Sequence, residues 1–155
     1  MEKSILDNKR LLIVDDEPDI LAVVKAEIRD ACPESTIDTA TTYEQALKLL
    51  KTNKYDIVIL DIMGVRGFDL LEEAIERKFK VAMLTAHALS PEALKKSHDM
   101  GAMAYLPKDK LGELVPFLED VLRYDYKTGW QRLMNKLDNY FTEQFEHDWK
   151  SNLWY

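Results

Sequence analysis

The sequence lacks several features that would mark particular classes of protein. Cys32 is its one cysteine, so no disulfide can form within the chain and the paired cysteines of a small secreted scaffold are absent. The longest apolar runs, such as Ile20 to Val24, are far shorter than the roughly 20 residues of a membrane-spanning helix. The N-terminal residues also lack the apolar core of a signal peptide. We therefore expect a cytoplasmic protein with no membrane partner.

Glycine, proline and positive charge are also scarce. Five glycines and five prolines in 155 residues are too few for a collagen-like or low-complexity chain, and the length suits one domain. The 21 basic residues against 28 acidic ones give a net charge of -7, the opposite of what binding to a phosphate backbone requires. We therefore expect a globular domain that does not bind nucleic acid.

Short apolar runs alternate with segments of helical spacing. Three runs read as strands buried on both faces, a more polar run reads as an edge strand, and a fifth strand follows the helix stop at Gly101. These segments are residues 11–14, 57–60, 81–84, 36–40 and 102–106. The alternation predicts an open, doubly wound α/β fold with a five-stranded parallel sheet.

Two helices are predicted after the fifth strand. The first carries Pro116, so it should begin near Gly112 or kink at the proline. The second is an aromatic-rich amphipathic helix in the extension 124–155, with apolar residues recurring from Trp130 to Trp149. This extension has 4 basic and 5 acidic side chains and is too short for a winged or helix-turn-helix domain.

Polar residues follow the predicted strands at the edge where ligands of such sheets bind. Asp15 and Asp16 follow the first strand, Asp61 the third, Thr85 the fourth and Lys108 the fifth. Three close carboxylates repel one another unless a cation lies among them, and an oxygen-only set favours Mg²⁺. An aspartate here can attack phosphorus, while Mg²⁺, the ammonium and the hydroxyl stabilise the phosphoryl oxygens.

Four segments in order resemble the signature of bacterial two-component response regulator receiver domains of the single-domain chemotaxis type. They are Leu12-Ile-Val-Asp-Asp-Glu-Pro18, Val58-Ile-Leu-Asp-Ile-Met63, Leu84-Thr-Ala86 and Gly101-Ala-Met-Ala-Tyr-Leu-Pro-Lys108. The resemblance covers residues 9–123 and implies a flavodoxin-like sheet of strand order 2-1-3-4-5.

The resemblance also implies a role for eight residues. Asp61 would be the phosphoacceptor, and Thr85 and Lys108 would contact the phosphoryl group. Mg²⁺ would be held by Asp15, Asp16, Asp61 and the backbone carbonyl of Met63. Tyr105 would be an aromatic switch coupled to Thr85. Met63 and His87 would flank the path of an attacking water and tune the lifetime of the phosphoryl group. The implied phosphoryl donor is a histidine kinase or a phosphotransfer protein.

The sequence departs from the family pattern at three places. The loop after Asp61 runs Gly64-Val-Arg-Gly67 without the usual proline, so the segment with the metal-binding carbonyl is expected to be reshaped. Only 24 positions separate Asp61 from Thr85, which predicts a shortened third helix. In addition, Pro107 precedes Lys108, whereas the family usually has a proline after this lysine.

We therefore expect a phosphoacceptor signalling protein that is not an enzyme and acts through protein contacts. One alternative is a phosphohydrolase of the haloacid dehalogenase type, but Met63 stands where such an enzyme needs a second aspartate. The helix of 124–155 has two interpretations. It either packs on its own domain, or it is an output surface for a homodimer or a target protein.

Overall fold

The computed structural model describes residues 3–86 and 90–145 of the chain. Five parallel strands form one sheet in the order β2-β1-β3-β4-β5, which confirms the predicted topology. The strands are β1 (Arg10–Val14), β2 (Thr36–Ala40), β3 (Ile57–Asp61), β4 (Lys80–Thr85) and β5 (Ala104–Pro107). The fifth strand begins two residues later than predicted, because Ala102 and Met103 still belong to the turn that follows Gly101.

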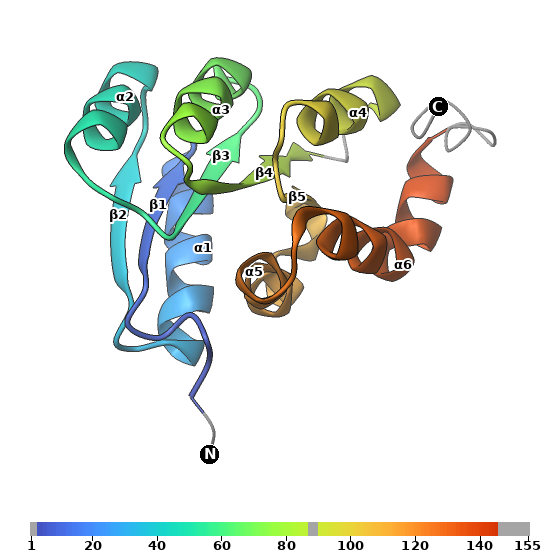
Figure 1. Ribbon diagram of the computed structural model, residues 1–155, viewed down its shortest axis with the longest axis horizontal. Helices are drawn as coiled ribbons and strands as arrows, with labels where there is room; N and C mark the ends of the chain where they lie inside the picture. Colours follow the sequence, from blue (N-terminus) through green and yellow to red (C-terminus); the bar gives the residue numbers. More distant parts are fainter. Residues whose placement is uncertain (1–2, 87–89, 146–155) are drawn as a thin grey trace.

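Helices cover both faces of the sheet (Figure 1). One face carries α1 (Pro18–Ala31) and α5 (Leu114–Arg123), and the other carries α2 (Tyr43–Thr52), α3 (Gly67–Glu76) and α4 (Pro91–Asp99). No helix in the described part of the chain is both long enough and apolar enough to span a membrane. The core lies between the helices and the continuous apolar strands, as expected for a doubly wound fold.

The strand register brings the predicted polar residues to one edge. Val14 pairs with Leu60, so Asp15 lies beside Asp61 at the ends of β1 and β3. Asp61 in turn pairs with Leu84, which precedes Thr85, and Thr85 pairs with Pro107 on β5. Lys108 follows directly after Pro107. The pairing alone therefore aligns these side chains along the carboxyl edge of the sheet.

Local capping explains where several helices begin. The hydroxyl of Thr42 accepts a 3.2 Å hydrogen bond from the Gln45 backbone N–H at the start of α2. The side chain of Gln45 accepts from the N–H of Thr41, one residue before the cap. Ser90 caps α4 in the same way, through the N–H of Ala93. These bonds satisfy N–H groups that have no partner inside the helix.

Pro116 lies in the first turn of α5, where a proline removes no intrahelical hydrogen bond. A 3₁₀ segment, η2 (Lys108–Glu113), joins β5 to this helix and passes through Gly112. The chain thus turns from the strand through Lys108 before α5 begins at Leu114. The prediction that the helix begins near Gly112 is confirmed.

The last helix, α6 (Tyr126–Gln144), is shorter than the sequence pattern suggested. The backbone becomes extended at Phe145, where α6 ends, and Trp149 lies outside the described residues. Its apolar face is buried on the same chain, against α5 and the β5 edge. The buried side chains on this face are Trp130, Leu133, Met134, Leu137 and Phe141.

Polar contacts fix α6 at several points. The Trp130 indole N–H donates to the Ala102 carbonyl at 2.8 Å. Asp120 of α5 forms ion pairs with Arg132 at 3.2 Å and with Lys136 at 2.9 Å. The described part of the extension therefore packs on its own domain, which agrees with the first of the two interpretations.

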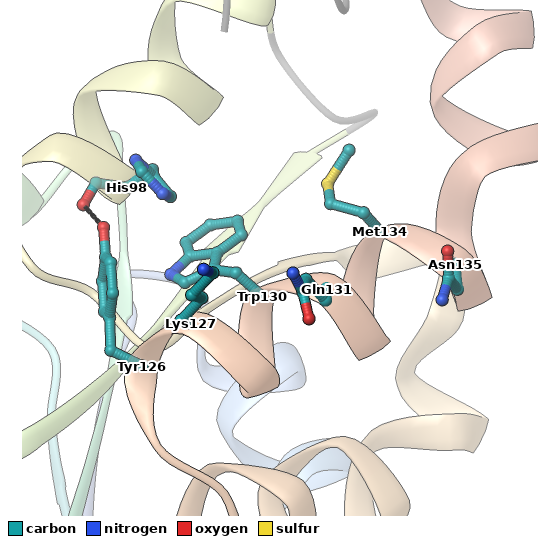
Figure 2. A pocket seen from close by; sticks show the side chains of 7 residues that line it. All are labelled: His98, Tyr126, Lys127, Trp130, Gln131, Met134 and Asn135. Atoms are coloured by element: carbon teal, nitrogen blue, oxygen red, sulfur yellow. Dashed lines mark hydrogen bonds between the residues drawn. The ribbon is translucent and has the colours of Figure 1, made fainter. Parts of the chain in front are cut away.

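A groove remains between α4 and the start of α6 (Figure 2). It encloses about 760 Å³ and is lined by His98, Tyr126, Trp130 and Met134 among others. The hydroxyl of Tyr126 donates a hydrogen bond to the backbone carbonyl of His98, which joins α6 to α4 beside the groove.

Candidate functional site

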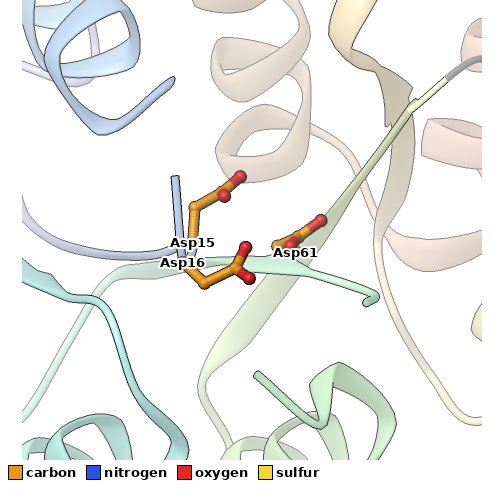
Figure 3. A group of neighbouring side chains, drawn as sticks. All are labelled: Asp15, Asp16 and Asp61. Atoms are coloured by element: carbon orange, nitrogen blue, oxygen red, sulfur yellow. The ribbon is translucent and has the colours of Figure 1, made fainter. Parts of the chain in front are cut away.

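Three carboxylates gather where β1 and β3 end (Figure 3). One oxygen each of Asp15, Asp16 and Asp61 lies within 4.8 Å of the other two. Asp15 is fully buried, Asp61 is 5% exposed and Asp16 is open to solvent. The site is therefore closed on the side of the sheet and open at Asp16.

Lys108 is the cation that faces this cluster. Its ammonium nitrogen lies 2.9 Å from Asp15 Oδ2 and 3.3 Å from Asp61 Oδ1. Only 12% of its side chain is exposed, because the turn from β5 into η2 directs it across the strand ends. Lys108 thus partly neutralises the two buried carboxylates.

Glu17 is a further member of the site to which the sequence analysis gave no role. Its Oε2 lies 2.9 Å from the Lys108 nitrogen, on the solvent side of the ammonium. Asp15 Oδ1 accepts a 2.9 Å hydrogen bond from the Glu17 backbone N–H and so fixes this residue at the start of α1. The sequence does contain a signal for this role, because Glu17 is a carboxylate that directly follows Asp16 at the same strand end.

The crowded charges shift the pKa values of the site. Burial, reinforced by the charge of Asp15, raises the pKa of Asp61 from 3.8 to about 6. Burial likewise raises the pKa of Asp15. Burial alone would lower the pKa of Lys108, but its bonds with Asp15 and Glu17 outweigh that effect and raise it. Above about pH 6 the site holds excess negative charge, which favours a bound cation.

Thr85 and Tyr105 are buried on β4 and β5, the two strands that follow β3 in the sheet. Thr85 is the last residue of β4 and is 1% exposed. Tyr105 on β5 is fully buried, and its hydroxyl lies 3.5 Å from the Ser90 carbonyl at the start of α4. Burial raises the pKa of this hydroxyl to about 12, whereas bonding to Thr85 opposes the rise. The two residues thus connect the site edge with the base of α4.

A family model matches the part of the chain that contains these strand-end residues. The response regulator receiver domain model matches residues 11–119, most of the chain. The chain belongs to the response regulator receiver family. It is therefore a phosphoacceptor module of two-component signalling, and the comparisons give no support to the haloacid dehalogenase alternative.

Curated relatives of this receiver domain are regulators of bacteria and plants. The transcriptional regulatory protein YvrH of Bacillus subtilis is 31% identical over 108 residues, which cover 66% of this chain and 44% of that protein. The two-component response regulator ORR21 of Oryza sativa is 28% identical over 149 residues, covering 93% of this chain and 19% of that protein. The chain spans less than half the length of the curated relatives it matches.

Solved receiver structures have the same fold. A CheY-like receiver domain protein of Methanospirillum hungatei is 25% identical with a TM-score of 0.58, and the match covers 87% of this chain and 98% of that one. The receiver domain of the Francisella response regulator 1452 is 26% identical with a TM-score of 0.63, covering 77% and 98%. The receiver fold is thus shared over the strands that carry the site.

The loop between β3 and α3 departs from the sequence pattern of receiver domains and packs closely on the site. Gly64 has a φ of +87° and lies against the Asp16 carboxylate, where a Cβ atom would come within 2.4 Å of Oδ2. A Cβ at Gly67 would come within 2.1 Å of the Asp61 carbonyl oxygen. Both positions therefore require glycine, and the loop packs closely on the Asp16 carboxylate and on the backbone of Asp61.

The two predicted tuning residues differ in what the structure shows. Met63 is 64% exposed beside the carboxylate cluster, so its side chain is accessible from solvent. His87 lies outside the described residues, and its predicted role stays a prediction. The shortened third helix has ten residues, from Gly67 to Glu76.

The residues present fit a hard divalent cation. All the side-chain ligands are carboxylate oxygens, which Mg²⁺ prefers. Asp15 Oδ2 is buried, and its partner is the Lys108 ammonium at 2.9 Å. One ammonium cannot balance three neighbouring carboxylates, so the donor set fits a divalent cation.

Proposed function

We propose that Asp61 accepts a phosphoryl group from a histidine kinase or a phosphotransfer protein in a Mg²⁺-dependent reaction. The observation that carries this proposal is the placement of Lys108 within 3.3 Å of Asp61 Oδ1, at an edge shared with Asp15 and Asp16. Asp61 is buried, as Asp15 is, and it is the last residue of the central strand β3. A donor approaching from solvent over Asp16 would reach this carboxylate directly.

Each side chain then has a defined part in the transfer. A carboxylate oxygen of Asp61 attacks phosphorus, the phosphorus–nitrogen bond to the donor histidine breaks, and the electron pair stays on the imidazole. Asp15, Asp16, Asp61 and the Met63 carbonyl would hold Mg²⁺, which when bound would supply positive charge near the phosphoryl oxygens. The Lys108 ammonium and the Thr85 hydroxyl would bind the remaining oxygens of the group.

The carboxylate of Glu17 gives Lys108 a second partner on the solvent side. When a metal ion binds Asp15 and a phosphoryl group is attached to Asp61, the ion pairs of Lys108 with these two carboxylates would weaken. The ion pair with Glu17 would then hold the Lys108 ammonium in the site. The product is an acyl phosphate on the protein itself, so the module would act as a signalling component and not as an enzyme with turnover.

Phosphorylation of the full chain by acetyl phosphate tests this proposal. We expect one shifted species in phosphate-affinity electrophoresis, which requires Mg²⁺ and disappears in Asp61→Asn. Asp30→Asn is the control, because Asp30 is an exposed carboxylate on α1 away from the strand ends. A shifted species that persists in Asp61→Asn would show that another residue is the acceptor.

The output of the module would pass through protein contacts, by homodimerisation or by binding of a target protein. The extension 124–155 adds a net charge of -1 and no basic stripe, which supports a protein partner. Sedimentation of the full chain with and without Mg²⁺ and beryllofluoride tests the first route. A protein that stays monomeric in both states would exclude homodimerisation and leave a target protein as the recipient.

A further inference from the structure

Arg66 has a backbone conformation that few residues other than glycine adopt. Its φ of 56° and ψ of 53° place it in the left-handed region, directly before the first residue of α3. Such a conformation is unfavourable for an arginine and persists only where other contacts enforce it.

Two contacts hold the Arg66 side chain. The guanidinium carbon lies 4.0 Å from the centre of the Tyr43 ring, a cation–π contact with the first residue of α2. The Nε–H donates a 2.9 Å hydrogen bond to Asp69 Oδ2 in the first turn of α3. Arg66 thus connects its own loop to the starts of two neighbouring helices.

The loop that Arg66 ends is the one that packs on the carboxylates. Ile62 and Val65 are buried in the core, so these two side chains attach the loop to the domain. Gly64 lies against the Asp16 carboxylate and Gly67 against the Asp61 backbone. Because a Cβ atom at either glycine would collide with these groups, the loop has no room to move toward them, and a shift of the backbone at Arg66 would move the Met63 carbonyl relative to Asp16 and Asp61.

We propose that Arg66 is a positioning residue for the metal site, acting through its contacts with Tyr43 and Asp69. These contacts select the left-handed backbone at Arg66, which in turn places the loop of residues 62–67 against Asp16 and Asp61. The inference rests on the proposed function of the site.

Replacing Arg66 with glycine separates the side chain from the backbone. Glycine adopts the left-handed region without penalty, so Arg66→Gly would bind Mg²⁺ as well as the wild type if only the backbone preference mattered. We expect instead that the dissociation constant for Mg²⁺ rises about threefold, the effect of losing one exposed cation–π contact. Arg66→Lys keeps a cation over the ring and should restore part of the affinity.

Tyr43→Leu removes the ring and keeps a side chain that can pack on the core, so it should weaken Mg²⁺ binding to a similar degree. The control is Arg77→Ala at the other end of α3, where the arginine pairs with Glu73 at 3.5 Å. The measurement is calorimetric titration of the full chain with MgCl₂, together with the thermal midpoint in the absence of metal. The control should leave the dissociation constant unchanged.

The outcomes separate this inference from the proposed function. If the wild type binds no Mg²⁺, or binds it equally well after Asp16→Ala, the proposed function of the site fails. If the wild type binds Mg²⁺ through Asp16 but either Arg66→Gly or Tyr43→Leu keeps the wild-type affinity, the positioning role of Arg66 is overturned. It is also overturned if Arg77→Ala weakens binding as much, because general loosening of α3 would then explain the effect.

Discussion

The rings of Tyr105 on β5 and Phe141 on α6 lie 6.0 Å apart, centre to centre, and both side chains are fully buried. Tyr105 is the residue whose hydroxyl approaches Ser90, and it stands one strand away from Thr85. Because the ring has no exposed surface, any reorientation of Tyr105 must displace side chains that pack on it. Phe141 is one of these side chains, so α6 contacts the predicted switch residue.

The first prediction is that Phe141 holds α6 on the domain. Phe141→Ala leaves a cavity beside Tyr105 and should lower the free energy of unfolding by about 3 kcal/mol, as for other buried phenylalanines. Chemical denaturation of both proteins measures this difference. Val23→Ala, at a position 45% exposed on α1, should cost less than about 0.5 kcal/mol. Equal losses in the two variants would show that α6 adds nothing specific to stability.

The second prediction concerns communication between the site and α6. With Mg²⁺ and beryllofluoride, Thr85 should be drawn toward the phosphoryl analogue and Tyr105 should follow, withdrawing its ring from Phe141. Backbone amides around Phe141 should then exchange hydrogen about threefold faster or more, because local opening becomes easier. Thr85→Ala should bind the analogue without this change. Unaltered exchange in the wild type would place α6 outside the signalling pathway.

The sequence was sufficient to predict the sheet and the strand-end residues for a physical reason. Parallel strands buried on both faces are continuous apolar runs, and the residue after each run must lie at the carboxyl edge. Asp15, Asp61 and Lys108 could therefore be placed at one edge from the sequence alone. Their distances could not, because these depend on the register of three strands and on the turn at η2.

Contacts between separate segments were beyond what the sequence pattern could predict. The pairing of Arg66 with Tyr43 joins a loop and a helix start 23 positions apart, and no periodicity connects them. The end of α6 at Phe145 was also missed, because the aromatic spacing continues to Trp149 without a glycine or proline. The burial of the α6 face became clear only from its contacts with Ala102 and Asp120.

The third prediction is a pH dependence that Asp61 creates. Its pKa of about 6 in the folded protein lies above the ordinary 3.8, so the folded state binds more protons than the unfolded state between these values. The free energy of unfolding should therefore fall as pH rises from about 4 to about 6 and then level off. Asp61→Asn removes this contribution and should be more stable than the wild type at pH 7 by roughly 1 to 3 kcal/mol.

Denaturation of both proteins at pH 4 and pH 7 without metal measures this effect. The difference between the two proteins should be small at pH 4, where Asp61 is protonated in the folded state. Addition of Mg²⁺ at pH 7 should stabilise the wild type more than Asp61→Asn. A constant difference at the two pH values would show that Asp61 does not carry the raised pKa.

The fourth prediction separates Lys108 from metal binding. Lys108→Ala leaves all three carboxylates in place, so Mg²⁺ should still bind. Phosphorylation by acetyl phosphate should slow by about 10- to 100-fold, because one charged donor to the phosphoryl oxygens is lost. Lys110→Ala is the matched control, since this lysine lies two residues away and pairs only loosely with Glu113 at 3.9 Å. Equal rates in the two variants would remove Lys108 from the transfer.

The fifth prediction concerns the lifetime of the phosphoryl group. Met63 is 64% exposed beside the cluster, and its thioether cannot orient a water molecule for attack on phosphorus. Dephosphorylation should therefore be slow, and Met63→Asn or Met63→Glu should accelerate it by about tenfold by supplying a group that binds the water. Release of inorganic phosphate after removal of acetyl phosphate measures the rate. Met63→Leu should behave as the wild type, because it supplies no polar atom. If Met63→Asn and Met63→Glu both keep the wild-type rate, water does not approach phosphorus past this side chain.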